Sequence, residues 1–398
     1  MAEGIWERIP LTSNYAAAHA AKDVDVDVVA AYPITPQTPA VEKIAEFIAN
    51  GELNAEMIHV ESEHSALSAC VGASAAGARV FTATSSQGLE LMHEILFIAS
   101  GMRLPIVMAI AARALSAPLS IWCDYGDLMA TRDTSWITLI ASSAQEVYDS
   151  IIQMYRVAED PEVLLPAMVA YDGFIMSHTY EPVYVATSKE PILEYAPKNY
   201  NRIKLDPDKP VTIGAYADPN WYYEFKYQQV VALRKAYDAI KRADEEFGKR
   251  FGRSYGLVEA YRSEDADIII LTYGGLYGTV TEAVDILRDK GLKVGAARIR
   301  LFRPFPVNEV VALAKNVKHV VVLDRAIAFG APLEGPVAME IAVALSRSYA
   351  DVNLYSYIVG IGQRTVTEQD IIGIVDHVTK FIEKKVRPEQ SIYWGVRE

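Results

Sequence analysis

Cysteine is scarce in this sequence, with only Cys70 and Cys123 among 398 residues. An iron–sulfur cluster requires about four thiolate ligands, so the chain is not expected to hold one unaided. Two cysteines also cannot form a disulfide framework, and we expect both to be small buried side chains. The seven histidines show no H-x-x-x-H spacing. No protein-bound transition metal is therefore predicted.

The sequence also has fewer basic than acidic residues, and it has no long apolar run. Lys and Arg number 38 against 51 Asp and Glu, giving a net charge of −13. Nucleic acid is an improbable main partner, because phosphate binding needs a basic surface. No stretch reaches the ~18 apolar residues of a membrane span, and the N-terminus has no basic segment followed by an apolar one. We expect a cytoplasmic protein that binds no membrane.

Apolar runs and helical patterns alternate through the first half of the sequence. This alternation predicts a doubly wound α/β domain over residues 12–185. Asn14 is expected to cap its first helix, and Ser85 or Ser86 is expected to cap a later one. The predicted strands are Val26–Ala31, Met57–Val60, Val80–Thr84, Pro105–Ala112 and Val163–Tyr171.

The second half has a different organisation. Residues 186–261 are expected to form a connection that contains a long amphipathic helix. Residues 262–365 again alternate strand and helix, which predicts a second, smaller α/β domain. Residues 366–398 are interpreted as a C-terminal helix and a tail, whose aromatic pair Tyr393-Trp394 is expected to dock against another surface.

Glu63 follows one of the predicted strands and opens a helix of small residues. The helix dipole would favour its anionic form and lower its pKa. An apolar cleft would instead raise its pKa and allow the carboxyl group to transfer a proton. The local sequence does not separate these two interpretations.

Other polar groups follow neighbouring strands, and ligands bind at the carboxyl ends of strands in open α/β sheets. Arg113 is either a surface charge at the rim of the site or a guanidinium that binds an external anion through paired N–H groups. Its sequence neighbours offer no anionic partner, which gives weight to the external anion. Thr35 either completes a turn or binds a ligand oxygen. The Thr84–Gly88 loop could bind an anion through backbone N–H groups, although N-capping is the commoner role.

Two further segments have weaker indications of a site. The Gly274–Gly278 turn follows a strand but lacks the G-x-G-x-x-G spacing of a dinucleotide site, so an NAD-dependent enzyme is the weakest hypothesis. The segments Asp124–Asp127 and Arg132-Asp133 could be catalytic, but a polar loop with local ion pairs is the simpler interpretation.

The ordered runs AYPITPQTP, HVESEHSA, GARVFTATSSQGL, AARALSAPLSIW and RDTSW are more specific than any single residue. In order and spacing they resemble the α subunit of the 2-oxoacid:ferredoxin oxidoreductases, particularly the four-subunit pyruvate:ferredoxin type. The segments FGKRFGRSYG and FRPFP extend the resemblance over most of the chain. It implies a pyrimidine-type thiamine-diphosphate-binding domain followed by a domain like the C-terminal domain of transketolase.

The activity that the resemblance implies is the oxidative decarboxylation of pyruvate to acetyl-CoA and CO2, with electrons passed to ferredoxin. Branched-chain members, which act on 2-oxoisovalerate, are similar and remain an alternative. A catalytically silent scaffold subunit is the non-enzyme alternative. In the family, Mg²⁺ and the [4Fe-4S] clusters belong to partner subunits, so β, γ and δ subunits are expected, with thiamine diphosphate shared with β and coenzyme A as co-substrate.

The resemblance also assigns roles to residues. Glu63 matches the glutamate that hydrogen-bonds the pyrimidine N1′ of thiamine diphosphate and is the expected catalytic residue. Thr35 and Arg113 match residues that bind the 2-oxoacid, Arg113 by pairing with its carboxylate. The cofactor is expected to contact Tyr32, Pro33, Glu63, Ser86 and Gln87.

Overall fold

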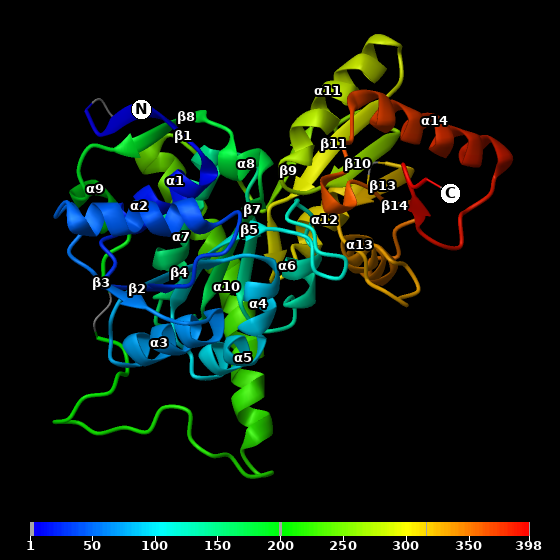
Figure 1. Cartoon of the computed structure of the whole chain (residues 1–398). Helices are drawn as coiled ribbons and strands as arrows, with labels where there is room; N and C mark the ends of the chain where they lie inside the picture. Colours follow the sequence, from blue (N-terminus) through cyan, green and yellow to red (C-terminus); the bar gives the residue numbers. More distant parts are fainter. Residues whose placement is uncertain (1–3, 199–200, 316, 398) are drawn as a thin grey trace.

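The computed structural model describes residues 4–198, 201–315 and 317–397, and it contains two α/β units, each built around one sheet (Figure 1). The first sheet has the order β12-β6-β7-β5-β4-β2-β3. Its strands are β2 (Val28–Ala31), β3 (Glu56–His59), β4 (Val80–Thr84), β5 (Ile106–Ala112), β6 (Ile137–Ile140), β7 (Ala167–Asp172) and β12 (Leu301–Arg303). A separate antiparallel pair joins β1 (Trp6–Leu11) to β8 (Glu181–Ala186).

Strand order in the first sheet creates a topological switch. Strand β2 pairs in parallel with β3 on one side and with β4 on the other. The chain therefore crosses over β2 after β3, and the sheet then grows through β4, β5 and β7. Every residue of β4 and β5 is buried, as expected for central strands covered on both faces. Ligands bind in such sheets at the carboxyl ends of the strands beside the switch.

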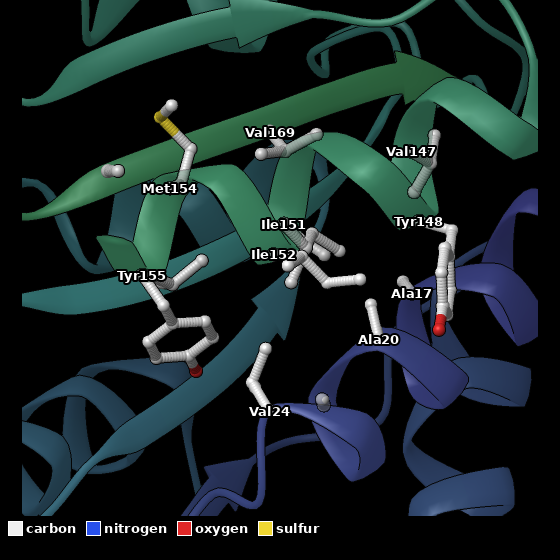
Figure 2. Packing of buried hydrophobic residues seen from close by; sticks show 14 of the residues in the cluster. Ala17, Ala20, Val24, Val147, Tyr148, Ile151, Ile152, Met154, Tyr155 and Val169 are labelled. Carbon is white, nitrogen blue, oxygen red and sulfur yellow. The ribbon is translucent and has the colours of Figure 1, made fainter. Parts of the chain in front are cut away.

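Helices cover both faces of this sheet (Figure 1). They are α1 (Ser13–Asp23), α2 (Thr38–Ala49), α3 (Glu63–Ala75), α4 (Ser86–Leu91), α5 (His93–Gly101), α6 (Gly126–Ala130), α7 (Ala144–Ala158), α8 (Ile175–His178), α9 (Glu190–Tyr195) and α10 (Tyr222–Phe251). Alanines of α1, including Ala17 and Ala20, pack against Ile151 and Ile152 of α7 (Figure 2). Small side chains let the two helices approach closely, which fixes the position of α1 beneath the β2 loop.

The first helix begins earlier than the sequence pattern predicted. Thr12 is its N-cap, and the Thr12 side chain accepts a hydrogen bond from the backbone N–H of Tyr15. The prediction that Asn14 caps this helix is therefore wrong. Asn14 lies inside the first turn, where its amide is free to bond elsewhere.

The second sheet has the order β15-β14-β13-β10-β11-β9. Its strands are β9 (Val258–Tyr261), β10 (Ile268–Thr272), β11 (Val294–Ile299), β13 (His319–Asp324), β14 (Asn353–Ile358) and β15 (Ile392–Tyr393). Its helices are α11 (Leu276–Asp289), α12 (Val307–Ala314), α13 (Pro336–Arg347), the short η1 (Ile361–Gln363) and α14 (Glu368–Lys384). The C-terminal tail docks on this same unit, because β15 pairs with β14 and Trp394 donates to Asp370 at 3.2 Å.

One strand links the two units. After β11 the chain crosses to the first sheet, where β12 pairs antiparallel with β6. Strand β12 lies within the predicted second domain of residues 262–365, yet it completes the first sheet. Buried ion pairs strengthen the junction, with Glu146 of α7 lying 2.9 Å from Arg300 and 3.0 Å from Arg298.

Two properties of the described residues bear on function. None of their helices is long and apolar enough to cross a membrane. Among the same residues, no group of three or more His, Cys, Asp or Glu side chains is placed to hold a metal ion. Both Cys70 and Cys123 are buried free thiols, as predicted.

Candidate functional site at the carboxyl edge of the first sheet

The loops that follow β2, β3, β4 and β5 meet at one edge of the sheet, since these strands are parallel neighbours. Thr35 lies in the first loop, Glu63 follows the second strand, and Arg113 follows the fourth. Ser86 and Gln87 begin α4 after the third strand. The structure thus gathers these five predicted site residues around the switch between β2 and β4.

Glu63 is the first residue of α3, and its neighbour Ser62 performs the capping. The Ser62 hydroxyl accepts from the backbone N–H of Ser65 at 3.3 Å. Only 6% of Glu63 is exposed. Burial raises the pKa of Glu63 above its ordinary value, although a hydrogen bond from its own backbone N–H opposes the shift. Of the two interpretations, the structure favours the proton-transferring carboxyl over the ordinary helix-end anion.

Gly88 forms one wall against this carboxyl group. A β-carbon at Gly88 would lie 2.5 Å from Glu63 Oε1 and 2.5 Å from Thr84 Oγ1. Real side chains do not approach so closely, so glycine is required for α4 to pack beside Glu63. The predicted Thr84–Gly88 loop therefore shapes the surroundings of Glu63 as well as starting a helix.

Several buried polar atoms near this point have no partner in the described chain. They are Thr84 Oγ1, Gln87 Nε2 and Glu90 Oε1. Buried polar groups are hydrogen-bonded in the great majority of proteins, and an unsatisfied one costs about 1–3 kcal/mol. These unpartnered donors and acceptors recur at every third residue from the end of β4 into α4, where they could bond a polar ring or another ligand.

Arg113 and Thr35 are brought together by a direct contact. Arg113 donates through Nη1 to the backbone oxygen of Thr35 at 2.8 Å and through Nε to that of Ser120 at 2.9 Å. Arg113 is buried, and Thr35 is exposed. Both acceptors are backbone carbonyls, which carry no net charge. The positive charge of the guanidinium is therefore not neutralised by a hydrogen-bonded carboxylate among the described residues. Burial lowers the pKa of Arg113, and the nearby charge of Asp127 acts in the opposite direction.

The turn that carries Thr35 is held from below by residues that the sequence patterns did not identify. Asn14 donates its amide to the backbone oxygen of Pro36 at 2.7 Å and accepts from the hydroxyl of Tyr171 at 2.8 Å. A β-carbon at Gly173 would lie 2.9 Å from Pro36, so glycine is needed there too. In the sequence, Asn14 was recognised only by its position near the start of a helix, which led to the wrong prediction that it is the helix cap.

The serines after β4 bond to neighbouring loops. Ser85 is the N-cap residue of α4, but its hydroxyl donates to the backbone oxygen of Ala111 at 2.7 Å and makes no cap bond. Ser86 has a positive φ of 50°, and its hydroxyl donates to the backbone oxygen of Ala114 at 2.6 Å. The prediction that Ser85 or Ser86 occupies the N-cap position is therefore confirmed for Ser85, although its side chain makes no cap hydrogen bond. Tyr32 and Pro33, the other predicted cofactor contacts, lie exposed at the end of β2.

The segment Asp124–Asp127 is more than a polar surface loop. Asp127 is fully buried and accepts hydrogen bonds from the backbones of both Ser86 and Arg113. Asp124 accepts from Gly362 at 3.0 Å and so reaches the second unit. Arg132 and Asp133 form a long ion pair of 3.9 Å, and Asp133 also lies 3.5 Å from Arg303 of β12.

The Gly274–Gly278 turn also has a structural explanation. The backbone N–H of Gly275 donates to Asp172 at 2.9 Å, and Asp172 accepts from the hydroxyl of Tyr125 at 2.5 Å. A β-carbon at Gly274 would lie 2.3 Å from the Tyr125 hydroxyl. The glycines therefore allow the two units to pack together, which removes the main reason to place a dinucleotide there.

Comparison with known protein families agrees with this geometry. Residues 19–245 match the thiamine-diphosphate-binding domain of pyruvate flavodoxin/ferredoxin oxidoreductase, and residues 266–371 match core domain II of pyruvate:ferredoxin oxidoreductase. The chain belongs to the family of 2-oxoacid:ferredoxin oxidoreductases, and it is an α subunit that carries the thiamine-diphosphate-binding domain of that family. The predicted family and α/β class are confirmed.

Individual relatives include subunits of two kinds of oxidoreductase. The chain is 47% identical to pyruvate synthase subunit PorA of Methanothermobacter thermautotrophicus, with 98% of each chain covered. It is 48% identical to the PorA subunit of Methanocaldococcus jannaschii, again with 98% of each covered. Identity to ketoisovalerate oxidoreductase subunit VorA of Pyrococcus horikoshii is 47%, with 96% of each covered.

Among solved structures, a 2-oxoglutarate:ferredoxin oxidoreductase from Magnetococcus marinus shares the fold. Its structure contains 2-oxoglutarate, coenzyme A and succinyl-CoA. The TM-score is 0.70 at 20% identity, with 94% of this chain covered. This chain spans 65% of that longer chain. At this identity the likeness supports the fold and no particular ligand.

Proposed function

We propose that this chain is the α subunit of a pyruvate:ferredoxin oxidoreductase and forms one wall of its thiamine diphosphate site. The reaction is the CoA- and thiamine-diphosphate-dependent oxidative decarboxylation of pyruvate to acetyl-CoA and CO2, with electrons passed to ferredoxin. The observation that carries the proposal is the buried Glu63 at the β2/β4 switch, with its raised pKa, beside polar atoms that lack partners.

The side chains around Glu63 fit a polar aromatic ring. Thr84 Oγ1 and Gln87 Nε2 offer hydrogen-bonding groups that nothing in the described chain uses. Because Gly88 has no β-carbon, the space beside the carboxyl oxygen Oε1 of Glu63 is not filled by a side chain at this position. Thiamine diphosphate, when bound, supplies stabilisation of the carbanion left after decarboxylation. Glu63 would hold a proton between its carboxyl group and the pyrimidine N1′, a task suited to a carboxyl group of raised pKa.

The 2-oxoacid would lie against the β5 end of the site. The Arg113 guanidinium is fixed by two backbone carbonyls, and no carboxylate among the described residues is bonded to it. It can therefore pair with the carboxylate of the substrate, for which a guanidinium provides a fork of N–H donors. The hydroxyl of Thr35 lies on the turn that Arg113 holds, where it can bond the keto or carboxylate oxygen.

The remaining chemistry requires other chains. With two buried cysteines, this chain has too few thiolates for [4Fe-4S] clusters. We assign those clusters, and the Mg²⁺ that binds the diphosphate, to partner subunits of β, γ and δ type. Thiamine diphosphate would lie between this chain and β, coenzyme A would accept the acyl group, and ferredoxin would accept the electrons. The names of the relatives, which are subunits, support this division.

The decisive experiment replaces Glu63 by Gln in the complete enzyme. Turnover with pyruvate, coenzyme A and a viologen acceptor is expected to fall by about 10²–10⁴-fold, while the subunits still assemble. The matched control is Glu61→Gln, because Glu61 is exposed two residues earlier in the same loop. Unchanged turnover in the Glu63 variant would reject the proposal and would revive the catalytically silent scaffold.

A branched-chain substrate is the second candidate, because ketoisovalerate oxidoreductase subunits are as similar to this chain as several pyruvate synthase subunits. The purified enzyme should be assayed with pyruvate, 2-oxoisovalerate and 2-oxoglutarate under the same conditions. The highest kcat/KM for pyruvate would support the first assignment. A preference for 2-oxoisovalerate would support the second, with the roles of Glu63 and Arg113 unchanged.

A further inference from the structure

Asp127 joins two loops of the site that are distant in sequence. Its Oδ2 accepts from the backbone N–H of Ser86 at 2.8 Å and from the backbone N–H of Arg113 at 3.0 Å. Its Oδ1 accepts from the backbone N–H of Leu128 at 2.7 Å. The side chain is fully buried. A carboxylate that served only its own short helix α6 would bond only the last of these groups.

Each of the two loops carries a different part of the site. Ser86 begins α4, the helix whose Gly88 lies against Glu63, and it adopts a positive φ of 50°. Arg113 directly follows the neighbouring strand β5, which ends at Ala112, and reaches Thr35 through its guanidinium. One oxygen atom therefore sets the cofactor side of the site relative to the substrate side.

We propose that Asp127 is a positioning residue that holds the substrate-binding Arg113 at a fixed place relative to the α4 loop. This inference rests on the proposed function, since it takes Arg113 as the group that binds the 2-oxoacid carboxylate. Hydrogen bonds from N–H groups to a carboxylate are stronger than those to a neutral acceptor. Displacement of a binding group by about 1 Å can cost 10²-fold in rate, so a strong and buried link between the loops has a functional consequence.

The electrostatic surroundings are consistent with a structural link. Burial raises the pKa of Asp127 to about 7, while the hydrogen bonds from Arg113 and Ser86 act to lower it. The neighbouring Asp124 also raises the pKa. Without its three backbone donors this carboxylate would be an isolated buried charge, which proteins avoid.

The test compares Asp127→Ala and Asp127→Asn with Asp124→Ala in the complete enzyme. Asp124 is the matched control, because it is a buried carboxylate of the same segment whose hydrogen bonds within the described chain are to Gly126 and Gly362 and not to Ser86 or Arg113. We expect Asp127→Ala to raise the KM for the 2-oxoacid about tenfold or more, with a smaller change in kcat. Asp127→Asn should lie between it and the wild type, because an amide oxygen can still accept from Ser86 and Arg113.

A second measurement does not depend on activity. Amide hydrogen exchange reports local opening, and the Ser86 and Arg113 amides should exchange faster in both Asp127 variants than in the Asp124 variant. If Asp127→Ala does not fold, Asp127→Asn alone must show the higher KM and the faster exchange. Equal KM values and equal exchange in the Asp127 and Asp124 variants would overturn the inference. If Glu63→Gln abolishes turnover in that case, the proposed function survives and only the role of Asp127 fails.

Discussion

The carboxyl edges of the two sheets have a similar strand topology, but they differ in whether their polar side chains have hydrogen-bond partners. Each contains a switch in strand order, between β2 and β4 in the first sheet and between β10 and β13 in the second. At the first edge, Thr84 Oγ1 and Gln87 Nε2 have no hydrogen-bond partner among the residues that the structure describes. At the second edge Asp324 accepts from the backbone N–H groups of Val337 and Ala338, and Arg325 pairs with Asp172, which ends β7 of the first sheet.

This difference shows that a switch point alone does not define a binding site. The same topology carries the proposed site in one unit and a contact between units in the other. What distinguishes them is whether the polar side chains are satisfied within the chain. The comparison predicts that substitutions at the first edge change catalysis or cofactor binding, whereas those at the second edge change stability.

The largest effect is expected for Gly88→Ala. The new β-carbon would lie 2.5 Å from both Glu63 Oε1 and Thr84 Oγ1, so the carboxyl group must move. Turnover of the complete enzyme should fall by about 10²-fold, as for a catalytic group displaced by about 1 Å. Gly72→Ala is the control in the neighbouring helix α3, because a β-carbon there meets nothing within 4 Å. Equal turnover of the two variants would contradict the role assigned to Gly88.

Where the second unit contacts the end of β7, Asp172→Asn should reduce stability. It leaves Arg325, which is 4% exposed, without a charged partner, and such losses cost about 3–5 kcal/mol. We expect the midpoint of thermal unfolding to fall by several degrees while the KM for the 2-oxoacid stays near the wild-type value. Asp285→Asn breaks an exposed pair with Arg262 and should have little effect. A changed KM with unchanged stability would reverse the distinction between the edges.

A smaller effect is expected for Thr84→Val at the first edge. The Thr84 hydroxyl has no partner in the described chain, so its removal should not lower thermal stability. If the hydroxyl bonds the cofactor, thiamine diphosphate should bind about fivefold to tenfold more weakly, the value of one hydrogen bond near 1 kcal/mol. Thr82→Val on the same strand removes a bond to the Ala30 oxygen and should show the opposite result, lower stability with unchanged binding. Titration of the complete enzyme with the cofactor distinguishes these outcomes.

The smallest effect concerns a buried acid away from both edges. Burial raises the pKa of Asp23 to about 7, although the hydrogen bond from Tyr148 opposes the shift. The folded state therefore holds this proton more tightly than the unfolded state, and stability contributed by Asp23 decreases as pH rises from about 4 to about 7. Asp23→Asn should remove this slope, so the unfolding midpoint of the variant should fall less than that of the wild type as the pH rises over that range. Parallel curves for variant and wild type would show that Asp23 does not titrate in this way.

The sequence could place the candidate site residues at one edge because they follow strands. Parallel strands end at one edge, so Thr35, Glu63 and Arg113 could be placed together without coordinates. The roles of Asn14 and Asp127 could not be predicted, since they depend on contacts 22 and 41 residues away. The burial that raises the pKa of Glu63 likewise depends on α4 packing beside α3, which no local pattern specifies.

The fold shows the same division. Strand Val80–Thr84 was predicted with its observed bounds, because a buried strand between loops has a clear pattern. The tertiary role of β12 was not predictable, since three residues that follow another strand give no periodic signal. The association of β12 with β6 is decided by the position of the whole second unit.

The crossing strand has a consequence for biosynthesis. Strand β6 has β7 on one side, and its other side is covered only by β12, which ends at Arg303. While the ribosome is making the second unit, the first sheet has an uncovered edge strand of four buried-type residues, Ile137–Ile140. Open edges of this kind pair readily with other chains. During synthesis the N-terminal unit therefore keeps an exposed edge strand that can pair with other chains. This edge is covered only after β12 has emerged from the ribosome, although the thiamine-diphosphate-binding domain itself ends near residue 245.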